Sequence, residues 1–366
     1  MNPTGNYELT NDIQITAIWD YSQAFKGVLD GKGYTITITE IGINGGLFRQ
    51  LTDGAEIKNL NIIYSNSTFS PVSPSGASAS CIGGLAASVS GSSNKKVKIE
   101  NVSVTASMSI TSAGVSNEIT VGGLIGNARN TNLSIKNCTF SGSISDTVSH
   151  NANSAFGGIV GMAPQTMQSL EIVECGNYAD ITAYCNVGGI LGWSRRWGSA
   201  AATKKLTIEK CVNRGNITCT NNANVGGIVA IVNGYNTADG NSTRIINNIN
   251  YGNVASTHES TANPAGICGN VQYGEAAINL YGNINYGTIS TAYGSFAPIA
   301  NAGLANILCI GNNFSITDDS TASGNGYTKV TDNESGSKTI ITALNAIYNS
   351  IYAFAGTRVR LLWEII

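Results

Sequence analysis

The sequence is short of charge. Only 11% of its 366 residues are Asp, Glu, Lys or Arg, and 20 basic against 22 acidic side chains leave a formal net charge of −2. A protein that binds nucleic acid or an anionic membrane surface through electrostatics carries a clustered excess of Lys and Arg. We therefore expect no nucleic-acid partner.

Long hydrophobic runs are also missing. No apolar stretch reaches the roughly 18 residues that a membrane-spanning helix requires. The first ten residues, MNPTGNYELT, contain neither the basic segment nor the apolar stretch of a secretion signal. The chain as given is expected to have no membrane span and no signal peptide.

Metal-binding patterns are absent as well. The only two histidines are His150, in HNANS, and His258, in HESTA, and the eight cysteines form no CxxC pair. Zinc sites in proteins combine His and Cys at short spacings. We therefore predict no metal site and no cofactor, and we interpret most cysteines as buried free thiols, because free Cys packs like a small hydrophobe.

What the sequence has in quantity is Gly, Asn, Ser, Thr, Ile and Val, with 43 glycines but only 6 prolines. This mixture is typical of short strands joined by tight turns, because β-branched residues favour strands and Gly and Asn favour turns. The composition indicates an all-β protein.

One short pattern, CVNRGNI at 211–217, recurs as CGNYADI, NINYGNV and NINYGTI. An aliphatic residue stands three positions before its first residue in nearly every copy, and most copies lie 35 to 37 residues apart. The equivalent first positions are Leu60, Val102, Cys138, Cys175, Cys211, Asn248, Asn283 and Ile310. A steady interval of this kind indicates one structural unit copied along the chain.

A second element, of the form GG-aliphatic, precedes each copy, as in GGLIG at 122–126 and GGIVG at 157–161. A glycine pair lets backbones approach closely, and the aliphatic residues after it suit a buried strand. Alternation places residues 211, 213, 215 and 217 on one face, while Ile208 is out of phase, so a bend is predicted near Glu209–Lys210. Coils of about 35 residues that stack on one another form a parallel β-helix, here of about eight coils.

The stacking predicts ladders of equivalent side chains. Amides at one corner should hydrogen-bond up the stack: Asn177, Asn213, Asn250, Asn285 and Asn312. Three residues, Cys138, Cys175 and Cys211, occupy another ladder position. The chain is divided into an N-terminal cap with first strands at 1–44, the coils at 45–316, and a C-terminal cap at 317–366. In the last segment we predict a short helix over 339–353 and a final strand over 358–366 that covers the last coil or pairs with another chain.

The GG-aliphatic-x-G elements, the opening FKGVLDGKGYTI (25–36), GGLF (45–48) and IKNLNI (57–62) resemble the GLUG-motif repeats of bacterial secreted and surface proteins. These include the non-catalytic repeat regions of immunoglobulin A-cleaving metallopeptidases. The resemblance covers about residues 5–316. It implies a right-handed parallel β-helix and a cell-surface or extracellular location, but no peptidase, because the sequence has no HExxH motif.

Two groups of residues are candidates for ligand binding. Tyr178, Arg214, Tyr251 and Tyr286 occupy one position in successive coils, and we call them the tyrosine–arginine row. Flat aromatic faces beside a guanidinium suit sugar rings, so we predict an exposed row that binds an extended glycan or a partner surface. The alternative is a row that only protects the corner.

The other candidate is GWSRRWGS (192–199), interpreted as an inserted loop. Its side chains Trp193, Arg195, Arg196 and Trp197 are suited to gripping a glycan, a carboxylate or a partner protein. The alternative is that the tryptophans pack over the edge of the coil.

The expected function is a non-catalytic bacterial surface or secreted module for adhesion, recognition or assembly, with a glycan or a surface protein as partner. One alternative is a carbohydrate-active β-helix enzyme, a lyase or hydrolase, which needs clustered carboxylates. The carboxylates available are Glu171, Glu174, Asp180 and Glu209. A second alternative is a phage or fibre component that assembles through its coil ends.

Overall fold

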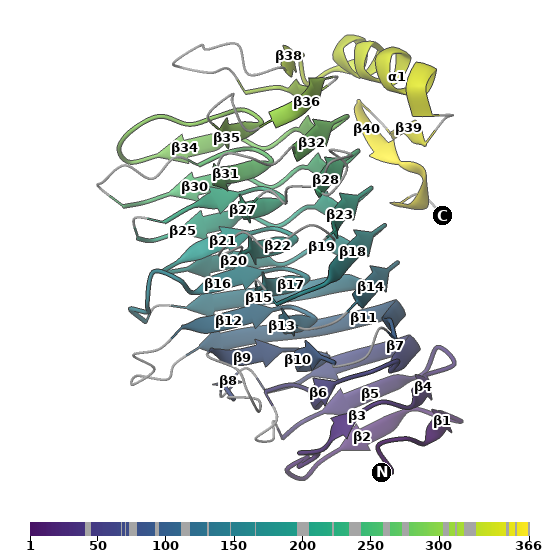
Figure 1. Ribbon diagram of the computed structural model, residues 1–366. Coiled ribbons are helices and arrows are strands. Elements are labelled where there is room, and N and C mark those ends of the chain that lie inside the picture. Colours follow the sequence, from purple (N-terminus) through teal and green to yellow (C-terminus); the bar gives the residue numbers. More distant parts are fainter. Residues whose placement is uncertain are drawn as a thin grey trace.

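The chain winds into a stack of β-coils, with the N-terminal strands at one end and a helix near the other (Figure 1). The computed structural model describes residues 1–364 except 41–44, 67, 70, 73–78, 92–94, 111–117, 130–131, 147, 165, 196–204, 222, 234–242, 259–263, 273–277, 303–306, 312, 318–326, 349–350 and 356. Neighbouring coils pair in parallel along their strands. The predicted all-β parallel β-helix is confirmed.

Three parallel sheets form the walls of the stack. The five-stranded sheet contains β9 (Ser80–Gly83), β12 (Ile119–Gly122), β16 (Ala155–Gly157), β21 (Asn186–Gly188) and β26 (Val225–Gly226). The nine-stranded sheet contains β3 (Ala24–Phe25), β6 (Phe48–Leu51), β10 (Ala86–Ser90), β13 (Ile125–Arg129), β17 (Val160–Ala163), β22 (Leu191–Ser194), β27 (Val229–Asn233), β31 (Cys268–Gln272) and β35 (Ala300–Ala302).

The long sheet has 24 strands, which follow the chain around one corner of every coil. Its first strands are β1 (Asn6–Glu8), β2 (Ile13–Ile15), β4 (Val28–Asp30), β5 (Thr35–Ile38), β7 (Glu56–Tyr64), β8 (Thr68–Phe69), β11 (Val97–Ile110), β14 (Asn132–Lys136), β15 (Thr139–Asp146), β18 (Ser169–Val173), β19 (Gly176–Asn177) and β20 (Asp180–Ala183). The remainder are β23 (Lys205–Glu209), β24 (Val212–Asn213), β25 (Ile217–Cys219), β28 (Thr243–Ile246), β29 (Ile249–Asn250), β30 (Val254–Ser256), β32 (Ile278–Tyr281), β33 (Ile284–Asn285), β34 (Ile289–Thr291), β36 (Ile307–Gly311), β37 (Asn313–Ser315) and β38 (Tyr327–Lys329).

The nine-stranded sheet receives one strand from each coil. Eight of its nine strands, β6 to β35, lie in the predicted coil region, in agreement with the eight predicted units. The ninth, β3, comes from the segment predicted as the N-terminal cap. Strands β1, β2, β4 and β5 of that segment also pair in parallel with the long sheet, so the stack begins well before residue 45.

In six of the described coils the corner turns on one non-glycine residue in the left-handed conformation. The φ angle of Lys210 is +53°, which confirms the bend predicted beside Glu209. The equivalent residues of other coils have φ between +51° and +59°: Asn59, Asn101, Asn137, Glu174 and Asn247. Asn recurs there because its short side chain tolerates this conformation better than other residues do.

The glycine pairs make room for the amide ladder. A Cβ on Gly189 would lie 2.6 Å from Cγ of Asn213 and 2.1 Å from the carbonyl oxygen of Gly227. The same close approach recurs one coil on, where a Cβ on Gly227 would lie 2.5 Å from Cγ of Asn250. In the coils of the amide ladder, the second glycine is therefore required by the inward-pointing amide that packs against it, whereas the equivalent Gly84 and Gly123 face the side chains of Val104 and Phe140.

The C-terminal unit, residues 334–364, is built from α1 (Glu334–Tyr348), β39 (Tyr352–Ala355), β40 (Arg358–Leu361) and the short 3₁₀ helix η2 (Leu362–Glu364). Asn333 caps the helix, since its side-chain oxygen accepts a hydrogen bond from the backbone nitrogen of Gly336 at 3.0 Å. Strands β39 and β40 pair antiparallel. Both a helix and a final strand were predicted, although α1 begins five residues before the predicted range.

The C-terminal unit lies beside the stack as well as near its end. Figure 1 shows β39 and β40, in yellow, along the outer side of the long sheet near β28 and β32. The expectation that the final strand covers the last coil is therefore corrected: β40 lies against the side of several coils. None of the helices in the described residues is long and apolar enough to cross a membrane.

Candidate functional site

The corner next to the tyrosine–arginine row is built on a buried amide ladder. Nδ2 of Asn177 donates to Oδ1 of Asn213 at 2.7 Å, and the same bond repeats from Asn213 to Asn250 and from Asn250 to Asn285, each at 2.8 Å. All four side chains are fully buried. This confirms the predicted ladder from Asn177 to Asn285, which continues to Oγ of Ser315 at 3.2 Å. Asn312, also predicted as a member, lies outside the described residues.

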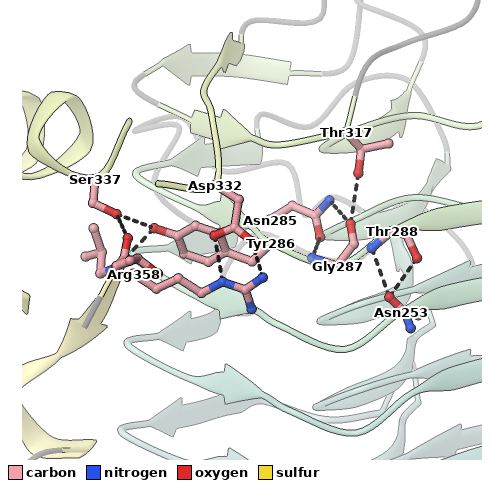
Figure 2. A network of polar contacts seen from close by, with 11 residues as sticks. Asn253, Asn285, Tyr286, Gly287, Thr288, Thr317, Asp332, Ser337 and Arg358 are labelled. Atoms are coloured by element: carbon pink, nitrogen blue, oxygen red, sulfur yellow. Dashed lines mark hydrogen bonds and ion pairs between the residues drawn. The ribbon is translucent and has the colours of Figure 1, made fainter. Parts of the chain in front are cut away.

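The amides also fix the backbone of the corner. Nδ2 of Asn250 donates to the carbonyl oxygen of Gly252 at 2.8 Å, and Nδ2 of Asn285 donates to that of Gly287 at 2.9 Å. Figure 2 shows Asn285 and Gly287 joined in this way. Buried polar groups are costly unless paired, so these hydrogen bonds keep the corner backbone in one conformation. Each residue of the row lies in that corner, and its position on the outside of the coil is therefore fixed.

Outside this corner, three members of the row stack as predicted. The rings of Tyr251 and Tyr286 have centroids 5.5 Å apart and planes 8° from parallel. The guanidinium carbon of Arg214 lies 4.3 Å from the ring centroid of Tyr251. The row is therefore a continuous column of flat groups, with a cation–π contact at its lower end.

The column is covered by the C-terminal unit. The hydroxyl of Tyr251 donates to the carbonyl oxygen of Val359 at 2.6 Å, and the backbone nitrogen of Val359 donates to the hydroxyl of Tyr286 at 3.1 Å. Tyr286 is 3% exposed and Val359 is fully buried. Burial raises the pKa of both tyrosine hydroxyls, so they remain protonated across the physiological range.

Charged side chains complete the cover. Arg214 forms an ion pair with Glu364, whose side chain is nearly buried. Arg358 pairs with Asp332 through two hydrogen bonds and lies over the ring of Tyr286 at 5.1 Å, an arrangement visible in Figure 2. The Arg214–Glu364 pair joins residues 150 positions apart, and the Val359–Tyr286 hydrogen bond joins residues 73 positions apart, so the end of the chain is tied to much earlier coils.

The prediction of an exposed row therefore holds for Tyr178 alone, which is 39% exposed. For Arg214, Tyr251 and Tyr286 the prediction of exposure is corrected. The C-terminal unit hydrogen-bonds to both tyrosine hydroxyls, covers the ring of Tyr286 and forms an ion pair with Arg214. The reason lies in the neighbouring outward positions. These are apolar in the covered coils, at Val212, Ile249, Ile284 and Phe314, and small or polar in the earlier coils, at Asn61, Ser103, Thr139 and Gly176.

That change of outward residues is a signal that sequence reasoning missed. Ile249, Ile284 and Phe314 are almost completely buried and join Leu344 and Leu361 of the C-terminal unit in a second hydrophobic cluster, outside the main core. An outward apolar ladder on a solenoid predicts a covering element.

The second candidate, Trp193 with Arg195, is also used by the fold. Trp193 is part of β22, is 7% exposed, and donates from Nε1 to Oδ1 of Asn233 at 2.9 Å. Arg195 lies 5.2 Å from the Trp193 ring and pairs with Glu118. The expectation that both grip a ligand from a loop is corrected, since Trp193 packs over the coil. Arg196 and Trp197 lie outside the described residues.

The cysteines follow the prediction where the structure describes them. Seven are free and buried: Cys81, Cys138, Cys175, Cys185, Cys211, Cys219 and Cys268. Burial raises the pKa of Cys81, Cys185 and Cys268 to about 12 and that of Cys219 to about 11. The side chain of Cys309 lies outside the description.

One buried pair was not predicted. Nε2 of His150 lies 2.9 Å from Oδ1 of Asp146, and neither side chain is exposed. The other oxygen of Asp146 accepts a hydrogen bond from the backbone nitrogen of Tyr184 in the next coil at 3.4 Å. The pair thus anchors the turn that follows β15.

The carboxylates considered for an enzyme are each engaged by neighbours. Glu171 pairs with Lys96 at 2.6 Å, Glu174 lies within 4.0 Å of Lys136 and Lys210, and Glu209 lies 4.0 Å from Arg244. Oδ1 of Asp180 accepts a hydrogen bond from the backbone nitrogen of Asn216 at 2.7 Å. In the part of the chain that the structure describes, no cluster of three or more His, Cys, Asp or Glu side chains is arranged to hold a metal ion.

Comparison with known proteins does not identify a family or a function for the chain. No protein-family model matches the chain, and no curated protein matches it. Among solved structures, a chain named IgA1 Protease is similar, with a TM-score of 0.46 and 17% sequence identity. The match covers 86% of this chain and 20% of that one, so this chain spans about a fifth of its length. At this identity and TM-score the likeness identifies neither a family nor an activity.

Proposed function

We propose that the chain is a non-catalytic structural and recognition module of a bacterial surface or secreted protein. The observation that carries the proposal is the unbroken hydrogen-bonded amide ladder from Asn177 to Ser315. It runs through five consecutive coils that also pair strand by strand, and a closely packed interior of this kind resists bending. Such a body suits a spacer that holds other parts of a protein at a distance from a surface.

The resemblance of the GG-aliphatic elements to GLUG-motif repeats supports the surface or extracellular setting. The state of the carboxylates supports a non-catalytic role, because Glu171, Glu174 and Glu209 lie beside cations and Asp180 supports a backbone ladder. A glycosidase or lyase acid is instead held near the bond it cleaves, with a pKa suited to proton transfer.

A recognition role rests on Tyr178. Its ring is partly exposed at the end of the row, next to Arg214, and an exposed aromatic face beside a guanidinium fits a sugar ring. A single site of this kind binds weakly, so useful affinity would come from several copies on one surface.

The test is a glycan-array assay beside an assay of sugar release from the same polysaccharides. We expect Tyr178→Ala to remove binding seen with the native chain, and Tyr293→Ala, at a tyrosine that is 60% exposed elsewhere, to leave it unchanged. Release of new reducing ends or unsaturated sugars by the native chain would overturn the non-catalytic assignment. The carbohydrate-active enzyme would then replace it.

A further inference from the structure

The hydroxyls of Tyr251 and Tyr286 bind the free edge of β40, where a neighbouring β-strand would otherwise pair. Strand β40 pairs with β39 along one edge, where Phe354 lies opposite Val359. Both backbone polar groups of Val359 are bound by the row, its carbonyl by Tyr251 and its N–H by Tyr286. An edge strand normally leaves such groups open to another strand. Here two stacked side chains from adjacent coils close that edge.

The row contacts the backbone of Val359 and the charged side chain of Glu364. The hydroxyls bind backbone atoms, so they place no demand on the side chain of Val359 itself. Further down, Nε1 of Trp363 donates to the carbonyl oxygen of Lys210 at 2.8 Å, and Glu364 pairs with Arg214. The row is therefore a docking site for β40, whose backbone the tyrosines bind, and for the 3₁₀ helix η2 that follows it, whose Glu364 pairs with Arg214.

The C-terminal unit also holds itself together. Oγ of Ser337 in α1 donates to the carbonyl oxygen of Thr357, and Nδ2 of Asn345 donates to that of Tyr352 at 3.4 Å. Ile340 and Leu344 of the helix are fully buried in the same cluster as Leu361 of β40. The helix and the hairpin therefore have contacts that survive if the unit leaves the row.

We propose that the row also accepts the C-terminal unit of a second copy of this chain, so that two chains associate by exchanging their units. Release of the unit uncovers two complementary surfaces on each molecule, the β40 edge at Val359 and the aromatic column of Tyr251 and Tyr286. Exchange between copies remakes the same hydrogen bonds, ion pair and apolar contacts, and so costs little at equilibrium once two chains meet. This inference does not depend on the proposed surface function.

The exchange is tested on full-length chains by cross-linking between copies. One population carries Arg214→Cys and a large affinity tag, and the other carries Glu364→Cys and a small one. The two are mixed at high concentration, warmed, and treated with a short bis-maleimide. We expect a cross-linked heterodimer whose yield rises with protein concentration, because the two positions are in contact only when a unit docks on the other copy. Unsubstituted chains give the background, since seven native cysteines are buried.

A matched control replaces Arg214→Cys by Tyr293→Cys, at a tyrosine that is 60% exposed and lies outside the hydrophobic cluster formed with the C-terminal unit. This mixture should give no heterodimer above background. Exchange is ruled out if the Arg214→Cys and Glu364→Cys chains also give none, while one chain carrying both substitutions cross-links as a monomer.

A second variant tests the hydroxyls themselves. Tyr251→Phe with Tyr286→Phe keeps both rings and removes only the hydrogen bonds to Val359. We expect heterodimers to form several-fold faster when this pair is added to both populations, because the unit leaves its own row more readily. An unchanged rate would show that the hydroxyls do not hold the unit and would overturn the docking site as described.

Discussion

A few residues in each corner decide how the chain turns. One lies in the left-handed conformation, and in the coils of the amide ladder another, three positions on, points an amide into the stack. Glu174 and Lys210 occupy the left-handed position where four other coils have Asn. A side chain with a full aliphatic stem is less tolerant of this conformation than Asn, so both residues hold local strain.

That strain can be relieved by substitution. We expect Glu174→Asn to raise the free energy of unfolding by about 0.5–1 kcal/mol, because Asn adopts the left-handed conformation more readily and the ion pairs lost are long and partly exposed. Glu171→Asn, in the middle of β18, is the control and should not stabilise. Denaturant unfolding of both variants measures the difference, and a loss of stability in Glu174→Asn would contradict the strain.

The strand phase sets a second expectation. Ile217 is completely buried, so Ile217→Asp places an unpaired carboxylate in the core and should cost about 4 kcal/mol or more. Cys211 is buried on the same face, but Cys211→Val keeps the site apolar and adds the volume of about one methyl group, so it should cost less than about 1.5 kcal/mol. Comparable melting temperatures for the two variants would contradict the assigned phase.

The thiols allow a test that depends on pH. Burial raises the pKa of Cys81, Cys185, Cys219 and Cys268, to about 12 for Cys268, so these thiols should react slowly with a thiol reagent in native protein even at pH 9, and unfolded protein should titrate nearly all eight cysteines. Unfolded thiols ionise above about pH 9 while the buried ones stay protonated, so the free energy of unfolding should fall as the pH rises through that region. Rapid labelling of several thiols in native protein would show that the core is not closed around them.

At the scale of elements, the outer face of the long sheet changes character along the stack. The coils from β24 onward present Ile249, Ile284 and Phe314, and the C-terminal unit buries them. This burial makes the tyrosines part of a second core, because Tyr286 packs in the same cluster and hydrogen-bonds to Val359. The tyrosine–arginine row, which the sequence suggests is a ligand-binding surface, is thus largely an internal interface between the coils and the C-terminal unit.

Removing one ring should therefore loosen the C-terminal unit. We expect Tyr286→Ala to cost about 3 kcal/mol of local stability and to speed tryptic cleavage at Arg358 and Arg360 at least tenfold. Tyr293→Ala, at a 60% exposed ring, should leave cleavage unchanged. Equal cleavage rates in the two variants would mean that the unit is held without the row.

The repeat could be predicted from the sequence because each coil obeys the same local constraints. The glycine pairs, the corner bend and the ladder from Asn177 to Asn285 all follow from residues that recur at one interval. The cover could not be predicted in the same way. Whether the ring of Tyr251 faces solvent is decided by Val359, 108 residues away, and no periodicity links the two.

The coil stack also begins before its pattern is visible. β3 joins the nine-stranded sheet although its segment carries no GG-aliphatic element, because parallel pairing with β6 requires backbone and not a particular sequence. The opposite holds for Trp193: its indole suggested a surface loop, but its position in register with Met162 and Ile231 on neighbouring strands places it in a small apolar cluster.

At the scale of the whole molecule, the chain is a stack of coils whose C-terminal unit folds back along the side of the stack. The contacts of Val359, Trp363 and Glu364 reach coils far from the end of the stack, so the C-terminal unit braces several coils at once. A solenoid gains stability from each neighbouring interface, and a lateral brace adds an interface that no single coil provides.

The C-terminal unit closes the tyrosine–arginine row in the native chain. Hydrogen–deuterium exchange with mass spectrometry tests it most directly, by comparing the peptide that covers 358–364 with the corner peptides 249–254 and 284–289. The expected result is slow exchange of the Val359 amide, comparable to that of the corners, since its N–H is bound by Tyr286 in a buried site. Complete exchange of 358–364 within seconds, with the corners still protected, would show that the row is open and would contradict the account.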